Sequence, residues 1–362
     1  MALRIAVYAI AKDESAFVER FCASARDADV IVIADTGSSD DTISVARRCG
    51  AVVHSIGISP WRFDKARDAA LALVPMDIDV CVSVDLDEVL VPGWREEIER
   101  HWTSGVTRLR YGFDWGNGLT FQDEKIHARV GYSWQYPCHE YLKCDVRHVE
   151  MMASTSAVIK RHLPDHTKSR GNYIDLLEMA VLDNPQCARS AFYYARELGF
   201  LRRWPEAVDA WHHWLSMPGS DWPVERCYAA RVLAVAYEQT GRLDEARHWY
   251  DEAIRISPDE REPWYALSCF LYRQQEWYGL AIASERALSC KTRSLWFTDE
   301  PEAWGSHPHD LAALAAYHIR DIDRAVAFGS AALALDPQNA RLAENLTAYQ
   351  QAVASTLIHS PE

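Results

Sequence analysis

Three carboxylates follow an apolar run in the stretch VCVSVDLDEVL, residues 80–90. In an extended strand, residues two apart face the same side, so the sequence predicts that Asp85 and Asp87 point at one place. Paired carboxylates at a strand end are hard oxygen ligands that suit Mg²⁺ or Mn²⁺ and leave coordination positions for phosphate oxygens and water. A solvated turn of an acidic chain would carry the same pattern, so the surrounding elements have to distinguish a metal site from a surface turn.

Short β-rich segments alternate with helical segments over residues 1 to about 110. The strand segments RIAVYAI, VIVIAD, AVVHSI and VCVSVD begin at residues 4, 30, 51 and 80. This alternation predicts a mostly parallel sheet with helices on both faces, whose ligand crevice lies beyond the carboxyl ends of the strands. Residues 105–165, rich in aromatic residues and Gly turns, suggest antiparallel strands beside this sheet. The charged residues of interest follow the strand ends: Lys12, Asp13 and Glu14, then Asp35, then Asp85 and Asp87.

Residues from about 170 onward have a helical pattern instead. Four segments repeat a helix, a short polar turn and an Ala-bearing second helix, most clearly in YEQTGRLDEARHWYDEAIRISPD, residues 237–259. They resemble the tetratricopeptide repeat, whose period is about 34 residues. Stacked helix pairs present a curved surface suited to a peptide, a partner protein or a second copy of the chain. The sequence therefore predicts an α/β domain over residues 1–170 and an all-α repeat domain over residues 171–362.

The α/β segment also carries spaced residues that resemble a known family. In chain order these are Asp13-Glu14, Asp35 with Gly37-Ser38, Asp41-Thr42, FDKARDAAL at residues 63–71 and VSVDLDEVL at 82–90. This order is similar to that of family 2 glycosyltransferases with the Rossmann-like GT-A fold and covers about 100 residues. Arg67-Asp68 departs from the Arg-Asn that is common there. YPCHEYL (136–142) and VIKRHLPDHTKSRGNYIDLL (158–177) resemble the subgroup with C-terminal tetratricopeptide repeats, which includes S-glycosyltransferases of bacteriocin peptides.

The resemblance implies metal-dependent transfer of a sugar from a nucleotide diphosphate sugar, preferably a UDP-sugar, to an acceptor. It implies that Asp85, Asp87 and His162 hold Mn²⁺ or Mg²⁺, with His166 as the alternative histidine. The nucleotide-sugar-binding residues implied by the resemblance are Ala9, Lys12, Asp13, Glu14, Asp35, Gly37, Arg67, Asp85 and Arg170.

An inverting transfer also requires a carboxylate that takes the acceptor's proton. Glu140 is the expected base, and Asp114 and Glu88 are the alternatives for this role. Asp87 is the second expected catalytic residue. Asp13 and Asp35 have a competing interpretation as capping residues of nearby turns and helices. Three aromatic residues would line a sugar or acceptor platform or else pack in the core: Trp115, Trp134 and Tyr136.

The composition of the chain limits the classes of molecule that it is expected to bind. The chain has 362 residues and a formal net charge of −14 at pH 7, which disfavours binding to a nucleic-acid backbone without excluding a local basic groove. We therefore expect a peptide or protein acceptor first, a glycan or lipid-linked acceptor second and a modified DNA base third. Nine cysteines without C-x-x-C spacing, and the lack of an apolar run of about 18 residues, predict a cytoplasmic protein without a membrane span.

Two other classes of protein use similar elements. A dinucleotide oxidoreductase would need G-x-G-x-x-G after the first strand, where this chain has YAIAKDES, so we exclude it. A non-catalytic repeat scaffold that binds a nucleotide is the alternative from a different class. In either case the repeats are expected to support a homodimer.

Overall fold

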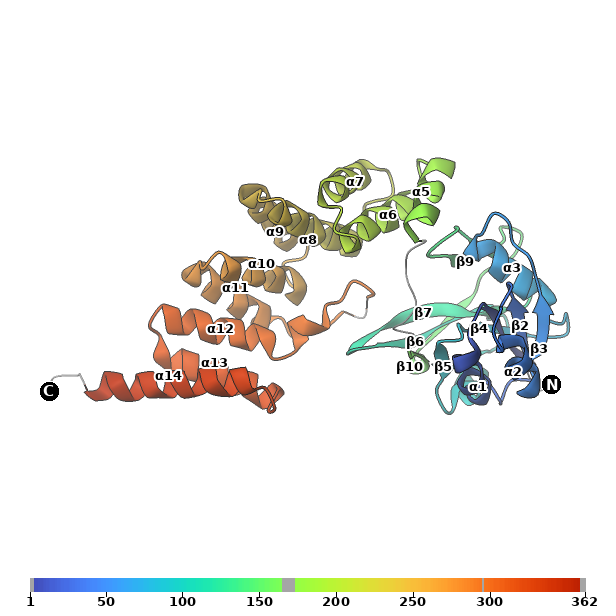
Figure 1. The fold of residues 1–362 in the computed structure, drawn as a ribbon, viewed down its shortest axis with the longest axis horizontal. Helices are drawn as coiled ribbons and strands as arrows, with labels where there is room; N and C mark the ends of the chain where they lie inside the picture. The colour runs from blue at the N-terminus through green and yellow to red at the C-terminus, as the bar shows by residue number, and fades with distance from the viewer. Residues whose placement is uncertain (1–2, 165–172, 295, 359–362) are drawn as a thin grey trace. The chain divides into compact units, whose positions relative to one another are not determined.

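The computed structural model describes residues 3–164, 173–294 and 296–358, with side chains up to residue 353. The chain divides into two compact units, residues 1–194 and 195–362, which we describe separately as the sheet unit and the repeat unit (Figure 1). The division falls inside helix α6 (Ala188–Phe200), beyond the boundary expected at residue 170. Among the described residues, no helix has the length and apolarity that crossing a bilayer requires.

An eight-stranded sheet forms the centre of the sheet unit. Its order is β3-β2-β1-β4-β7-β6-β10-β5, and the first four strands are parallel, with β1 paired to both β2 and β4. The strands are β1 (Ile5–Ala11), β2 (Val30–Asp35), β3 (Val52–Ser55), β4 (Val80–Ser83), β5 (Glu88–Leu90), β6 (Arg108–Gly116), β7 (Leu119–Ala128) and β10 (Met152–His162). The four strands that were expected from the sequence are therefore present and parallel.

The second half of the sheet changes direction. Strand β7 is antiparallel to both β4 and β6, and β5 is antiparallel to β10, while β6 and β10 are parallel. The sheet is thus mixed, with four parallel and three antiparallel pairs of neighbouring strands. The cause is the β6–β7 hairpin, whose tight turn at residues 117–118 can join only antiparallel neighbours.

The side chains of β1 point alternately to the two faces of the sheet, and both faces are covered. Ile5, Val7 and Ala9 pack on one side with α1 (Ser15–Ser24), α2 (Thr42–Arg48) and α4 (Trp94–His101). Ala6 and Tyr8 pack on the other side with α3 (Phe63–Leu73) and the hairpin of β8 (Tyr132–Gln135) and β9 (Tyr141–Cys144). Successive side chains of a strand point to opposite faces, so an unbroken apolar run serves a doubly covered sheet.

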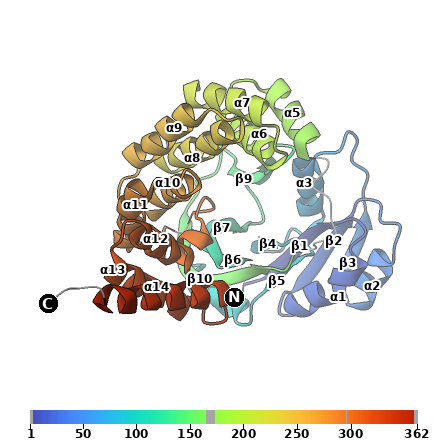
Figure 2. The same cartoon turned by 60° about the vertical axis from the view of Figure 1, so that its left-hand side comes forward.

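The repeat unit is a stack of antiparallel helix pairs (Figure 2). Small side chains let paired helices approach closely: Ala230 of α8 and Ala253 of α9 are fully buried where these two helices pack. The first helices of successive pairs also contact each other, α8 with α10 and α10 with α12, so they form the inner side of the stack. Helix α5 (Tyr173–Asp183) belongs to the sheet unit. The other helices of the repeat unit are α7 (Trp204–Ser216), α8 (Pro223–Gln239), α9 (Leu243–Ile256), α10 (Arg261–Arg273), α11 (Trp277–Ser289), η1 (Pro301–Trp304), α12 (His307–His318), α13 (Ile322–Leu335) and α14 (Ala340–Ile358).

Candidate functional site

The acidic residues after β4 lie in a turn and not on an extended strand. Strand β4 ends at Ser83, and the backbone N–H of Glu88 donates to the carbonyl of Asp85 at 2.9 Å. The expectation that Asp85 and Asp87 share one strand face is therefore wrong. The turn directs the two carboxylates to different partners: Asp85 meets Arg67, and Asp87 meets His162.

Arg67 of α3 connects two of the expected site residues. Its side chain is 5% exposed, and its Nη2 lies 2.7 Å from Oδ1 of Asp85. Its Nε forms an ion pair with Glu140, and its guanidinium lies over the ring of Trp134 at 5.1 Å. Desolvation raises the pKa of Asp85, but the positive charges of Arg67, Lys125 and Lys160 together outweigh it, and the pKa lies below its usual range. Glu140, the expected base, thus binds a buried cation in this structure.

Asp87 and His162 come from the turn after β4 and from the end of β10. Oδ2 of Asp87 lies 3.4 Å from Nε2 of His162, and the imidazole stacks on Trp115 with ring centres 4.2 Å apart. Desolvation lowers the pKa of His162, yet the neighbouring carboxylate of Asp87 shifts the net pKa above its ordinary value. Nδ1 of His162 is buried without a hydrogen bond of normal geometry. The end of β10 thus brings a carboxylate oxygen and an imidazole nitrogen into contact.

The donor atoms fit a divalent cation in part. A carboxylate oxygen and an imidazole nitrogen are both ligands that Mn²⁺ accepts, and a magnesium-type ion often takes only one or two protein carboxylates beside substrate phosphates. Within the described ranges, no group of three or more His, Cys, Asp or Glu side chains is placed to hold a metal ion. Asp87 and His162 would therefore be the protein ligands, with Asp85 drawn to Arg67 beside them.

A buried ion network supports the acidic turn from below. Nζ of Lys160, whose side chain is fully buried, lies 2.9 Å from Oε2 of Glu88 and 3.1 Å from Oδ2 of Asp123. The same oxygen of Glu88 accepts the backbone N–H of Asp85 at 2.9 Å. Tyr111 donates its hydroxyl to Asp123 at 2.9 Å. Glu88, considered from the sequence as an alternative base, instead ties the turn to β10.

Sequence reasoning missed Lys160, Asp123 and Tyr111. The available signal was a lysine in the apolar end of β10, AVIKRH, since a charge buried in a strand needs a partner. The partners themselves were not visible, because Glu88 stands 72 residues away from Lys160 along the chain.

The loops after β1 and β2 hold each other through their carboxylates. Oδ1 of buried Asp35 accepts the backbone N–H groups of Gly37 and Ser38, each at 3.0 Å. Oδ1 of Asp13 accepts the N–H of Ser39 at 2.7 Å, and this bond lowers the pKa of Asp13 below its usual value. The contacts of Asp35 are those of its capping interpretation, whereas Asp13 binds the neighbouring turn and Asp40 accepts the N–H of Ser15 at the start of α1. A nucleotide contact by either carboxylate stays a prediction.

The other expected residues are scattered around this edge. Ala9 is buried in β1, Lys12 is exposed, and the N–H of Glu14 donates to Oγ1 of Thr42 at 2.7 Å. Gly37 has a φ of 108°, a conformation that favours glycine.

The alternative base and the aromatic residues have other partners. Asp114 pairs with Arg161 at 2.8 Å, Trp134 is fully buried, and Trp115 is half-exposed. The hydroxyl of Tyr136 accepts a hydrogen bond from Sγ of Cys187 at 3.2 Å. Arg170 and His166 lie outside the described residues.

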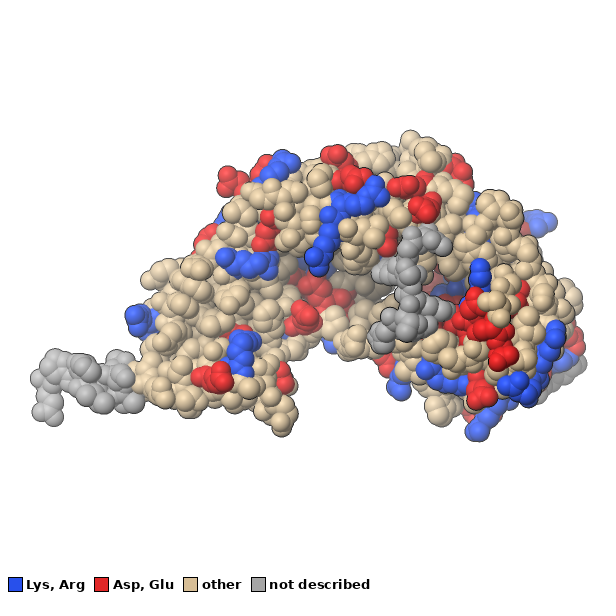
Figure 3. All heavy atoms as spheres, in the orientation of Figure 1, with Lys and Arg blue, Asp and Glu red and all other residues tan. Residues whose placement is uncertain are grey.

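Surface charge is strongly acidic in part of the sheet unit. Figure 3 shows Asp and Glu side chains gathered over the region in which Figure 1 draws β2 and β4. A diphosphate would be repelled from such a surface unless a cation stood between them. The charge pattern therefore agrees with a site that needs a divalent ion, and it disfavours a nucleic-acid backbone.

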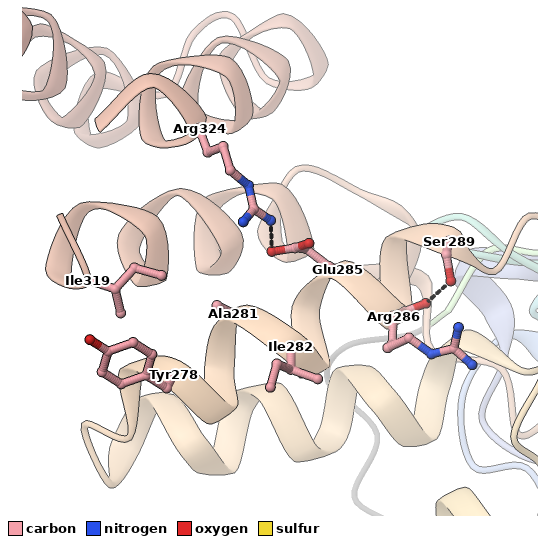
Figure 4. A pocket seen from close by; sticks show the side chains of 8 residues that line it. All are labelled: Tyr278, Ala281, Ile282, Glu285, Arg286, Ser289, Ile319 and Arg324. Carbon is pink, nitrogen blue, oxygen red and sulfur yellow. Dashed lines mark hydrogen bonds and ion pairs between the residues drawn. The ribbon is translucent and has the colours of Figure 1, made fainter. Parts of the chain in front are cut away.

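Hollows elsewhere in the chain do not coincide with the acidic turn. One of about 480 Å³ lies in the repeat unit and is lined by Tyr278, Ile282 and the ion pair of Glu285 with Arg324 (Figure 4). Another of about 220 Å³ lies in the sheet unit beside Arg62. Neither is lined by Asp85 or Asp87, so neither of these two hollows is the candidate site.

Comparison with known proteins bears on the repeat unit. The profile of the tetratricopeptide repeat family matches residues 227–260, which contain most of α8 and all of α9. Residues 227–260 form a tetratricopeptide repeat. The repeat assignment made from the sequence is thus confirmed for this part of the chain.

Relatives and solved structures include other repeat proteins. A TPR repeat-containing protein of Synechococcus elongatus is 26% identical over 321 residues, which cover 78% of this chain and 74% of that protein. This share is larger than the repeat unit, so the similarity extends into the sheet unit. PilF of Pseudomonas aeruginosa is 15% identical, covering 49% of this chain and 72% of that chain, with a TM-score of 0.38. YrrB, described as a TPR protein with an unusual peptide-binding site, is 15% identical, covering 49% and 84%, with a TM-score of 0.40.

Proposed function

We propose that the sheet unit is a metal-dependent glycosyltransferase that takes its sugar from a nucleotide diphosphate sugar, with a UDP-sugar preferred. The observation that carries this proposal is the contact of Asp87 with His162, beside Asp85 and at the carboxyl end of the parallel strands. This edge is where ligands bind in open α/β sheets. The similarity of residues 13–90 to family 2 glycosyltransferases supports the same conclusion.

Each residue of the pair has a role that its surroundings allow. A bound Mn²⁺ or Mg²⁺ supplies Lewis-acid stabilisation of the charge that develops on the leaving diphosphate. Asp87 and His162 would hold it, which leaves coordination positions for phosphate oxygens. Arg67 keeps Asp85 ionised and in place. Glu140 reaches the same guanidinium, so it would act as a base only after separating from Arg67.

The acceptor that we propose is a peptide or protein, because the chain joins the sheet unit to tetratricopeptide repeats, whose stacked helices suit extended chains. A glycan, a lipid-linked sugar and a modified DNA base are the acceptors to test next. Cytoplasmic location and self-association through the repeats stay predictions.

A thermal-shift panel of the full chain tests the donor site. UDP, GDP, CDP and TDP are each added with Mn²⁺, Mg²⁺ or EDTA to wild type and to Asp87→Asn. We expect one nucleotide to raise the Tm only with metal, because a ligand at 100 times its Kd stabilises by about 2.7 kcal/mol. Asp87→Asn should lose this shift, and the exposed control Asp27→Asn should keep it. A chain that responds to no nucleotide in either metal contradicts the proposal.

The rival function is a repeat scaffold whose sheet unit binds a nucleotide without catalysis. It is favoured by the ion pair of Glu140 with Arg67, because a carboxylate bound to a guanidinium is not free to accept a proton from an acceptor. Slow release of nucleoside diphosphate from the sugar nucleotide, measured with the same variants, separates the two. Metal-dependent release that Asp87→Asn abolishes supports the transferase, and nucleotide binding without release supports the scaffold.

A further inference from the structure

The connection between α11 and α12 is unusual among the turns of the repeat unit. The equivalent connection between α9 and α10 spans residues 257–260, whereas this one spans 290–306 and contains η1. We name residues 296–304 the inner strap, since they pack on α8 and α10, the first helices of two repeats. Figure 2 draws this part of the chain in orange beside α10 and α12. Thr298, Asp299 and Ala303 of the strap are buried.

Arg231 of α8 binds the strap as it would bind a peptide. Its side chain is 5% exposed, its Nη1 pairs with the carboxylate of Glu300, and its Nη2 donates to the carbonyl of Thr298 at 3.0 Å. One guanidinium thus recognises both a backbone carbonyl and an acidic side chain. A planar group with several fixed donors suits such bidentate recognition.

The next repeat makes equivalent contacts. Arg261 of α10 donates to the carbonyl of Ala303 at 3.2 Å and lies over the ring of Trp304 at 3.8 Å. Glu262 accepts the indole N–H of Trp304 at 2.7 Å. Tyr265, one turn further along α10, donates to Glu302 at 3.4 Å. Two successive first helices therefore contact carbonyls, carboxylates and an aromatic side chain of one connecting segment, which includes η1.

We propose that the inner strap is an internal ligand, which occupies the face of α8 and α10 where an acidic peptide of a partner protein binds after the strap has left. The charge complementarity supports this occupant: Arg231 and Arg261 are buried cations in a chain of net charge −14, and each faces strap carbonyls or carboxylates. A tethered segment competes at an effective concentration of order mM. The strap thereby sets a threshold that a partner peptide has to exceed.

A fluorescent peptide with the sequence of residues 296–304, WFTDEPEAW, is the probe for this face. It is titrated by anisotropy against the full wild-type chain and against the double variant Glu300→Ala/Glu302→Ala, whose strap is weakened while Arg231 and Arg261 are intact. We expect the double variant to bind the peptide at least tenfold more tightly than wild type. The exposed control Glu344→Ala should bind like wild type, and adding Arg231→Ala to the double variant should abolish binding.

Equal affinity of wild type and the double variant would overturn the proposal, as would a double variant that keeps its helical circular dichroism and binds no peptide. A measurement on wild type alone covers the case in which the variant does not fold. Backbone amides of the strap should exchange hydrogen faster than those of α10, because an internal ligand leaves without unfolding the repeat. Exchange of both at one common rate would mean that the strap is part of the core.

Opening of the strap should also depend on pH. Desolvation and then the carboxylate of Glu262 on α10 raise the pKa of Asp299 to about 7, against Arg293, which pairs with it at 2.7 Å. A folded-state pKa above the ordinary value gives stability that is fully present below about pH 4 and lost as pH rises to about 7. We expect strap amides, after correction for intrinsic exchange, to open at least tenfold more often at pH 7.5 than at pH 5. Asp299→Asn should remove this difference; a wild-type strap that opens equally at both values contradicts it.

Discussion

Replacing Lys160 with methionine should lower the free energy of unfolding of the sheet unit by about 3–5 kcal/mol, the usual cost of removing one partner from a buried ion pair. Lys160 is fully buried and is in contact with two carboxylates, Glu88 and Asp123. Without the ammonium group Glu88 loses its ion-pair partner and Asp123 keeps the hydroxyl of Tyr111, beneath Phe113, whose ring lies 4.6 Å from Nζ. Urea denaturation followed by tryptophan fluorescence measures the change.

The loss should depend on pH with a defined sign. Burial already raises the pKa of Glu88, and without Lys160 that pKa rises further. A raised folded-state pKa gives stability that disappears as the pH increases, so Lys160→Met should be more destabilised at pH 8 than at pH 5. Adding Glu88→Gln should restore part of the stability, because the amide still accepts the N–H of Asp85. The exposed control Lys143→Met should change stability by less than about 0.5 kcal/mol. An equally small effect for Lys160→Met would show that the network does not support the fold.

Arg67→Met is expected to have the second large effect, because it removes the positive charge shared by Asp85 and Glu140. The loss of stability should again be about 3–5 kcal/mol, reduced by the partial exposure of Asp85. The pKa of Asp85 should rise, since Arg67 is the first of three cations, with Lys125 and Lys160, that lower it against desolvation. Metal-dependent stabilisation by a nucleotide should weaken at the same time, because Asp85 then lacks the partner that fixes its carboxylate.

Arg67→Lys sharpens this prediction. An ammonium group is a point donor and cannot reach two carboxylates as a forked guanidinium does. The stability of the Arg67→Lys protein should therefore lie between that of wild type and that of Arg67→Met. Arg26→Met, at an exposed position, is the matched control. The midpoints of urea denaturation rank the stability of wild type and the three variants. The thermal shift caused by nucleotide and metal measures whether each protein keeps the donor site. If Arg67→Met kept the wild-type midpoint, the bridge between α3, β4 and the loop of Glu140 would have no structural weight.

These two cations hold the acidic turn from opposite sides. Lys160 reaches it through Glu88, which accepts the N–H of Asp85, and Arg67 reaches it through the carboxylate of Asp85. The turn between the two is thereby pre-organised with Asp87 directed at His162. A metal site benefits from such support, because ligands fixed by outer contacts lose less entropy on binding. The geometry of the proposed donor site therefore depends on Lys160 and Glu88, which act on the turn from the sheet beside it.

The sequence alone determined the elements and their order. Apolar runs of β-rich residues marked β1 to β4, and the helix–turn–helix period marked the pairs from α6 to α13, because both patterns are local periodicities that burial imposes on successive residues. The ends of the parallel strands also identified the edge where Asp13, Asp35 and Asp85 lie. The mixed second half of the sheet was visible only as aromatic strands of unspecified direction.

Only the tertiary structure decided which side chains meet. Arg67 and Glu140 are separated by 73 residues along the chain, and Arg231 and Glu300 by 69. Such pairs depend on how whole strands and helices pack, and a periodic pattern records that a position is buried without recording against what. The turn that separates Asp85 from Asp87 has the same origin. Its shape follows from an N–H bond to Glu88, and Glu88 is held by a lysine of the neighbouring strand β10, which lies 72 residues further along the chain.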